Sequence, residues 1–184
     1  MNTTVAFAAQ ATAILMGFFT RVVFTRMLSE GYVGINGLFT DILNILSLSE
    51  LGVGTAITYA LYGPIARNDI KKQQILMRMF RTFYRITAGV VLIAGLCLIP
   101  FLDILMKDRP DVDHLIIIYL LYLLNSFVSY LLIYKKILVD AHQMNYITVM
   151  YHNGFLVLQD ICQIIVLLLT RNFILFLIVA VVCT

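Results

Sequence analysis

Tryptophan is absent from the 184-residue sequence, and cysteine and proline occur only three times each. Charged residues are scarce as well, at 12% of the chain, against roughly 25% in soluble domains. Hydrophobic residues make up 61%, which is more apolar surface than a soluble fold can bury. These proportions exclude an ordinary soluble domain. They predict an all-α fold, a polytopic transmembrane helical bundle.

The cysteines and histidines show no pattern of a chemical site. Each of the three cysteines lies within an apolar run, where a small buried hydrophobe is its ordinary role. The three histidines lack any metal-ligand spacing such as His-Glu-x-x-His. We therefore expect no metal, no cofactor and no catalytic residues, and we expect no nucleic-acid partner.

Long apolar runs predict five complete membrane spans and the start of a sixth. The predicted helices cover residues 5–25, 33–62, 86–105, 115–134, 147–169 and 173–184. A span needs about 20 residues, so the last segment is too short to cross. We expect the chain to be one lobe of a longer, two-lobed transporter. The first apolar run has no basic segment before it and no cleavage site, so we expect no cleavable signal peptide.

Residues 65–81 are predicted to form a cytoplasmic amphipathic loop on the membrane surface. The segment carries five basic residues against one acid, Asp69, and its apolar residues follow a helical period. Basic residues gather in cytoplasmic loops, so this segment places the N-terminus on the cytoplasmic side. We expect its main role to be contact with anionic head groups of membrane lipids.

Three carboxylates stand inside predicted spans: Asp41, Glu50 and Asp160. A charge at the bilayer centre costs roughly 2.5–3.5 kcal/mol on insertion scales, so such groups turn toward protein or a wet cavity. Each has two interpretations. It is a structural ion pair or hydrogen-bond anchor, or it couples H+ or Na+ movement to transport, since burial raises a carboxylate's affinity for protons.

The first predicted helix combines small residues with terminal arginines. Ala9, Ala13 and Gly17 recur every four residues and form a face for close helix packing. Arg21 and Arg26 follow. Each arginine either extends to the interface, which is common at helix ends, or points into a cavity and binds an anion. The fourth predicted helix carries Asn125, Ser126 and Ser129, and the second carries a polar stripe that includes Asn44.

Several segments, taken in order, resemble a known family. They are Arg21-Val-Val-Phe-Thr-Arg-Met-Leu, Tyr32-Val-Gly-Ile-Asn-Gly-Leu-Phe, Ser49-Glu-Leu-Gly-Val-Gly-Thr-Ala-Ile, Leu61-Tyr-Gly-Pro-Ile-Ala, Phe80-Arg-Thr-Phe-Tyr-Arg and Tyr134-Lys-Lys. Together they are similar to the N-terminal region of bacterial polysaccharide flippases. These flippases belong to the multidrug/oligosaccharidyl-lipid/polysaccharide exporter superfamily. The similarity covers nearly the whole chain.

The resemblance implies a function in polysaccharide biosynthesis. It implies two pseudo-symmetric lobes in the bacterial cytoplasmic membrane, with the C-terminal lobe of the same protein as partner. It also implies alternating access that moves an undecaprenyl-pyrophosphate-linked sugar repeat unit from the inner to the outer leaflet. Arginine suits such a lipid-linked oligosaccharide because its planar group donates two parallel hydrogen bonds to phosphate. The expected substrate-binding residues are Arg21 first, then Arg26 and Arg85.

Three other function classes stay open. A drug or cation antiporter of the same superfamily should have an acidic cleft, against which Arg21 and Arg26 argue. A membrane enzyme of polysaccharide assembly should carry its site in a large external loop, whereas the longest predicted outer connection is 103–113. A non-transporting membrane interaction fragment would bind a partner and show no activity.

Overall fold

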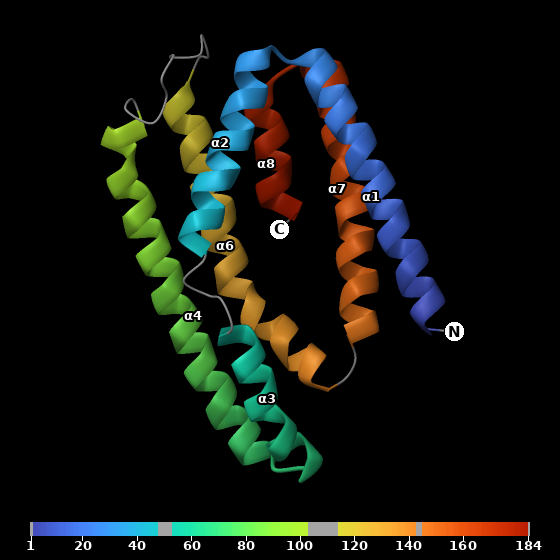
Figure 1. Ribbon diagram of the computed structural model, residues 1–184, viewed down its shortest axis with the longest axis vertical. Coiled ribbons are helices and arrows are strands. Elements are labelled where there is room, and N and C mark those ends of the chain that lie inside the picture. Colours follow the sequence, from blue (N-terminus) through green and yellow to red (C-terminus); the bar gives the residue numbers. More distant parts are fainter. Residues whose placement is uncertain (1, 48–52, 103–113, 143–144, 184) are drawn as a thin grey trace.

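Apolar helices account for the architecture. The computed structural model describes residues 2–47, 53–102, 114–142 and 145–183, and all regular secondary structure in these ranges is helical, which confirms the all-α class. The elements are α1 (Asn2–Met27), α2 (Glu30–Ser47), α3 (Val53–Ala66), α4 (Ile70–Leu98), the short 3-10 helix η2 (Ile99–Phe101), α6 (Leu115–Ala141), α7 (Asn145–Thr170) and α8 (Phe173–Cys183) (Figure 1).

Three stretches in the described part of the chain are long and apolar enough to cross a membrane. They are Ile70–Phe101, Leu115–Ala141 and Ile147–Thr170. The apolar helix α8 is shorter. The protein is therefore a membrane protein, and the finer prediction of five complete spans with the start of a sixth is not confirmed.

The segment predicted as one helix over 33–62 contains two described helices, α2 and α3. Residues 48–52 between them lie outside the described residues. Glycine disfavours a helix by about 1 kcal/mol relative to alanine, and Gly54 lies in the first turn of α3.

The prediction for 65–81 is an amphipathic helix within a cytoplasmic loop; in the structure, a short turn follows α3 and the helix α4 begins at Ile70. Asn68 adopts a left-handed φ of 56°, and the Asp69 side chain accepts a hydrogen bond from the Lys72 backbone nitrogen at 3.1 Å, which caps α4. Lysine and arginine are good helix formers, so the basic segment continues directly into the apolar one. The predicted helix 86–105 is therefore the second half of a longer helix.

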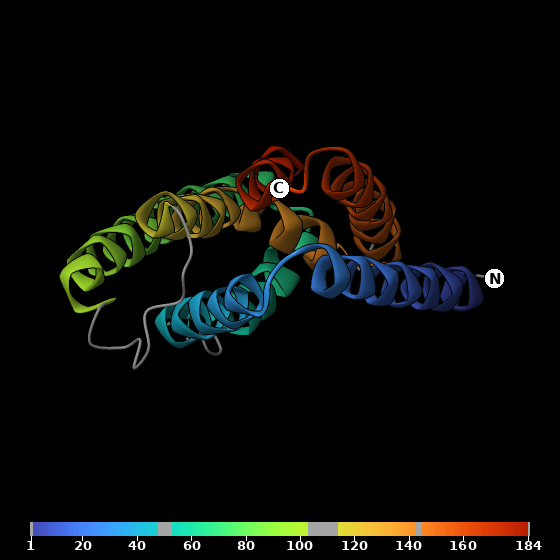
Figure 2. The ribbon, with the colours of Figure 1, turned by 90° about the horizontal axis from the view of Figure 1, so that it is seen from above.

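The helices form two groups, which Figures 1 and 2 show on opposite sides of the molecule. Helix α1 packs along α7, and α4 packs along α6 with α2 and α3 beside it; α8 contacts both α6 and α7. The turns after α1 and α7 lie at one end, and the turn between α3 and α4 lies at the other (Figure 1). This arrangement keeps the basic first turns of α4 away from the α1–α2 turn.

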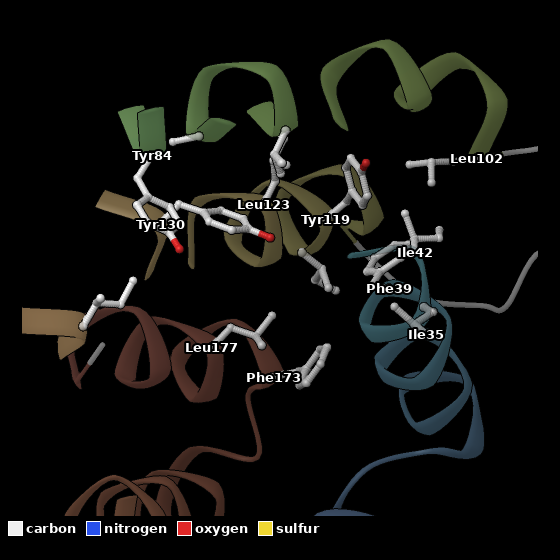
Figure 3. Packing of buried hydrophobic residues seen from close by; sticks show 14 of the residues in the cluster. Ile35, Phe39, Ile42, Tyr84, Leu102, Tyr119, Leu123, Tyr130, Phe173 and Leu177 are labelled. Atoms are coloured by element: carbon white, nitrogen blue, oxygen red, sulfur yellow. The ribbon is translucent and has the colours of Figure 1, made fainter. Parts of the chain in front are cut away.

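The core lies where α2, α4, α6 and α8 meet (Figure 3). Gly95 on α4 has no side chain, so Leu123 of α6 packs directly against that point of α4. The Tyr119 hydroxyl donates a hydrogen bond to the Gly95 carbonyl oxygen at 2.8 Å. Phe39 of α2 contacts Tyr119 edge to face, with ring centroids 5.1 Å apart. These contacts fix α6 between α4 and α2.

Candidate functional site

A groove with both polar and apolar lining lies between α2 and α6, with a volume of about 380 Å³. Seven of its nine lining residues can hydrogen-bond, and none of the nine carries a charge. Its lining is Thr40, Leu43, Asn44, Tyr122, Asn125, Ser126, Ser129, Tyr130 and Ile133. We call this surface the α2/α6 groove. Since α6 is a candidate membrane span, so many polar groups on one of its faces require an explanation other than lipid contact.

Helical spacing places these side chains on facing surfaces. Residues three, four or seven apart share a helix face, and Asn125, Ser126 and Ser129 follow Tyr122 at those intervals. Ser129 donates its hydroxyl hydrogen to the Asn125 carbonyl oxygen at 3.0 Å. Such internal bonds let small hydroxyl residues stand in an apolar helix. Their oxygen lone pairs stay available to accept a further hydrogen bond.

A contact between α2 and α6 adjoins the groove at Tyr122. The Tyr122 hydroxyl donates a hydrogen bond to Oδ1 of Asn36 on α2, which joins segments that are far apart in the sequence. The rings of Phe39 and Tyr122 meet edge to face at 5.8 Å. Tyr122 therefore holds α2 in register with α6 and lines the groove at the same time.

Arg21, the first predicted site residue, is linked to Tyr122 through aromatic rings and does not line the groove. Its side chain is exposed on α1, and its Cζ atom lies 5.5 Å from the centre of the Phe24 ring. The Phe24 ring contacts Phe173, whose ring centre lies 6.5 Å from that of Tyr122. The sequence alone did not connect Arg21 with α6.

The other two predicted arginines are placed differently. Arg26 is exposed in the last turn of α1. Arg85 is exposed on α4, and α4 lies on the opposite side of the molecule from α1 (Figures 1 and 2). The structure therefore does not bring Arg85 together with Arg21 and Arg26.

The three predicted carboxylates also separate. Asp41 is exposed on α2, about 100° around the helix from Thr40, and it forms no salt bridge with another described residue. Glu50 lies outside the described residues. Asp160 is partly buried on α7, where its Oδ2 atom lies 3.9 Å from the position that a Cβ at Gly17 would occupy.

The surroundings of Asp160 form a closed polar contact between α1 and α7. Thr20 of α1 is buried and donates its hydroxyl hydrogen to the Met16 carbonyl oxygen at 3.1 Å. Two turns before Asp160, Asn153 donates from Nδ2 to Oε1 of Gln10 at 3.0 Å. We call this contact the α1/α7 seam. It favours the structural interpretation of Asp160, and ion coupling stays a prediction.

The seam also tests the predicted small-residue face. Ala13 is buried, and Gly17 brings the backbone of α1 close to Asp160. Both residues face α7, as the spacing predicted, while the side chain of Ala9 is not among those described. Gln163, one turn beyond Asp160, is buried and donates from Nε2 to the Phe176 carbonyl oxygen of α8 at 3.3 Å.

Sequence reasoning missed Asn36, Thr40, Tyr122 and Tyr130. A signal existed for α2, because Asn36, Thr40 and Asn44 recur every four residues and therefore share one face. No comparable signal tells which helix that face meets. In comparisons with protein-family models, curated proteins and solved structures, none matches this chain.

Proposed function

We propose that this chain is the N-terminal lobe of a flippase that carries undecaprenyl-pyrophosphate-linked sugar repeat units across the bacterial cytoplasmic membrane by alternating access. The α2/α6 groove is the observation that carries the proposal. Sugars present many hydroxyl groups, and amides, hydroxyls and tyrosine rings offer them hydrogen bonds and apolar ring faces. A groove that combines such hydrogen-bonding groups with apolar lining offers contacts to both the hydroxyl groups and the apolar faces of a sugar ring.

Arg21 supplies the second part of the proposal. The cargo joins a neutral or weakly charged saccharide to a diphosphate, and an exposed guanidinium on α1 together with an uncharged groove between α2 and α6 matches that division. Hydrogen bonds between arginine and phosphate are charge-assisted and roughly twice as strong as neutral ones. A cation antiporter would instead need carboxylates in the groove, and none of the nine lining residues is acidic.

A binding experiment tests this division. The chain is placed in lipid nanodiscs and offered three ligands in turn: undecaprenyl-pyrophosphate bearing a short oligosaccharide, the same lipid without sugar, and a quaternary ammonium cation. Native mass spectrometry then measures the bound fraction. We expect the saccharide-bearing lipid to bind most tightly and the cation least. Preferential binding of the cation would favour the antiporter instead.

The proposal also predicts what the chain does alone. One lobe forms only half of a cleft between two lobes, so the 184-residue chain reconstituted in vesicles should not move the saccharide-bearing lipid between leaflets. A lectin added outside the vesicles measures the saccharide that reaches the outer leaflet. Rapid flipping by the chain alone would contradict the two-lobed architecture.

A further inference from the structure

The side of α4 that faces away from the core carries a continuous apolar stripe. Its members recur at three-, four- or seven-residue intervals, and their side chains are 57–68% exposed: Ile75, Met79, Ile86, Val90 and Ile93. The core residues of α4 lie on the opposite side of the helix, since they include Tyr84, Ala88 and Val91. No other described helix covers the stripe.

Three cations follow one edge of this stripe. Lys71, Arg78 and Arg85 are seven residues apart, so each is displaced by only about 20° around the helix from the one before. All three are exposed. In the described part of the chain, no carboxylate forms a salt bridge with any of them. Their charges are therefore available to an anion outside the protein.

Two further basic residues of α4 are engaged elsewhere. Lys72 forms a salt bridge with Asp69, with Nζ 3.6 Å from Oδ2. Arg81 places its Cζ atom 6.0 Å from the centre of the Tyr134 ring, toward α6. Lys71, Arg78 and Arg85 therefore form a row of cations on α4 that is distinct from Lys72 and Arg81.

Arg78 lies at an apolar hollow of about 560 Å³. The other residues of this hollow are Ile75, Met79, Thr82, Phe83 and Ile86. Thr82 donates its hydroxyl hydrogen to the Arg78 carbonyl oxygen at 3.0 Å, so the guanidinium is the hydrogen-bond donor that the hollow can offer to an anion. One cation beside an exposed apolar surface matches a molecule with one anionic group and a long apolar tail.

The length of the stripe indicates where such a molecule lies. From Arg78 to Ile93 the helix rises about 22 Å, at about 1.5 Å per residue. One leaflet with its head groups measures about 20–22 Å, half of the roughly 40–45 Å of a whole bilayer. A cation at head-group depth followed by apolar contacts through one leaflet corresponds to a single membrane lipid.

We propose that α4 binds an anionic glycerophospholipid, with the phosphate at Arg78 and an acyl chain along Ile86, Val90 and Ile93. Lys71 and Arg85 lie on the same edge of the helix, each about 10 Å along its axis from Arg78. An anionic phospholipid supplies both a phosphate for Arg78 and an acyl chain for the apolar stripe. The site does not depend on what the protein transports.

The experiment uses the chain in nanodiscs that contain equal amounts of phosphatidylglycerol and phosphatidylethanolamine. After mild detergent extraction, native mass spectrometry counts the lipids retained. The wild-type chain should retain an anionic lipid preferentially. Arg78→Gln should weaken that preference about fivefold, since a basic residue near the surface contributes about 1 kcal/mol to anionic-lipid binding. Arg81→Gln, which removes the same charge from the same helix, should leave the preference within twofold.

A second measurement needs no substitution. A phosphatidylglycerol with a photoactivatable acyl chain should label peptides from residues 75–93 ahead of the exposed apolar face of α7. Equal labelling of both helices would overturn the proposal. An equal loss of preference in Arg78→Gln and Arg81→Gln would also overturn it, and so would the absence of any preference between the two phospholipids. Displacement of the bound lipid by an equimolar polyprenyl diphosphate would overturn it as well.

Discussion

The α1/α7 seam and the α2/α6 groove contain the same kinds of polar side chain, but the seam is a closed helix contact and the groove is open. In the seam, the amides of Gln10 and Asn153 hydrogen-bond to each other, and the Asp160 side chain lies beside Gly17. In the groove, seven hydrogen-bonding residues line an open volume of about 380 Å³. Amides and hydroxyls within apolar helices are therefore not diagnostic by themselves. The two regions differ in whether the polar residues stand at a closed helix contact or beside an open volume.

Packing explains why the two regions differ. Ala13 and Gly17 let α1 approach α7 closely, and close approach brings polar side chains into direct contact. The groove instead lies beside large aromatic residues. Phe39, Tyr119 and Tyr122 keep α2 and α6 apart while joining them edge to face. Small residues close one interface, and aromatic residues hold the other open.

Arg21→Ala should have the largest effect on function. Hydrogen bonds to charged groups contribute about 1.5–3 kcal/mol, so affinity for the diphosphate-linked saccharide should fall about 10- to 100-fold. In a transporter that has both lobes, flipping should be abolished while membrane insertion stays normal. Arg67→Ala removes an exposed cation at the opposite end of the molecule and should leave both intact. Wild-type flipping by Arg21→Ala would remove this residue from the mechanism.

Gly95→Ala should have the largest effect on stability. A Cβ at Gly95 would collide with the buried Leu123 side chain, and overpacking of this kind costs about 1–3 kcal/mol. Gly17→Ala is the matched control, because its Cβ would lie 3.9 Å from Asp160 Oδ2, an ordinary contact. Helicity during titration with sodium dodecyl sulfate measures both. If the control is the less stable variant, our description of the two interfaces is wrong.

The seam should contribute to stability and leave ligand binding unchanged. A double-mutant cycle with Gln10→Ala and Asn153→Ala isolates their hydrogen bond of 3.0 Å. We expect a coupling of about 0.6 kcal/mol and at most about 1.7 kcal/mol, as for other hydrogen bonds between membrane helices. The same detergent titration supplies the free energies. A coupling near zero, or a changed affinity for the saccharide-bearing lipid, would show that the seam has another role.

Ser126→Ala should show the smallest effect. In contrast to the seam variants, it should lower ligand affinity and leave stability nearly unchanged. Loss of one hydrogen bond to the ligand should lower affinity about fivefold, corresponding to about 1 kcal/mol. Stability should change by less than about 0.5 kcal/mol. Thr58→Val on α3 removes a hydroxyl outside the groove and should leave affinity unaltered. Equal affinities for the wild type and Ser126→Ala would mean that the groove does not hold the saccharide at this point.

Much of the fold follows from local pattern, and most of the site does not. The apolar runs predicted helices that overlap α1, α6, α7 and α8, and α6 continues beyond the predicted end at residue 134 to Ala141. The periodicity of 65–81 predicted an amphipathic helix, but its basic charge was taken to separate that helix from the following span, whereas α4 is continuous. The bond between Asn36 and Tyr122 depends on how two distant helices align. No local pattern in the sequence encodes that register.

Cysteine accessibility compares the groove and the seam most directly. In a chain whose native cysteines are replaced by alanine, Ser126→Cys and Ala13→Cys are each treated with a water-soluble maleimide in nanodiscs. We expect rapid labelling at position 126, slowed by the saccharide-bearing lipid but not by the sugar-free lipid, and almost no labelling at position 13. Equal labelling rates at the two positions, or no protection by the saccharide, would contradict the account.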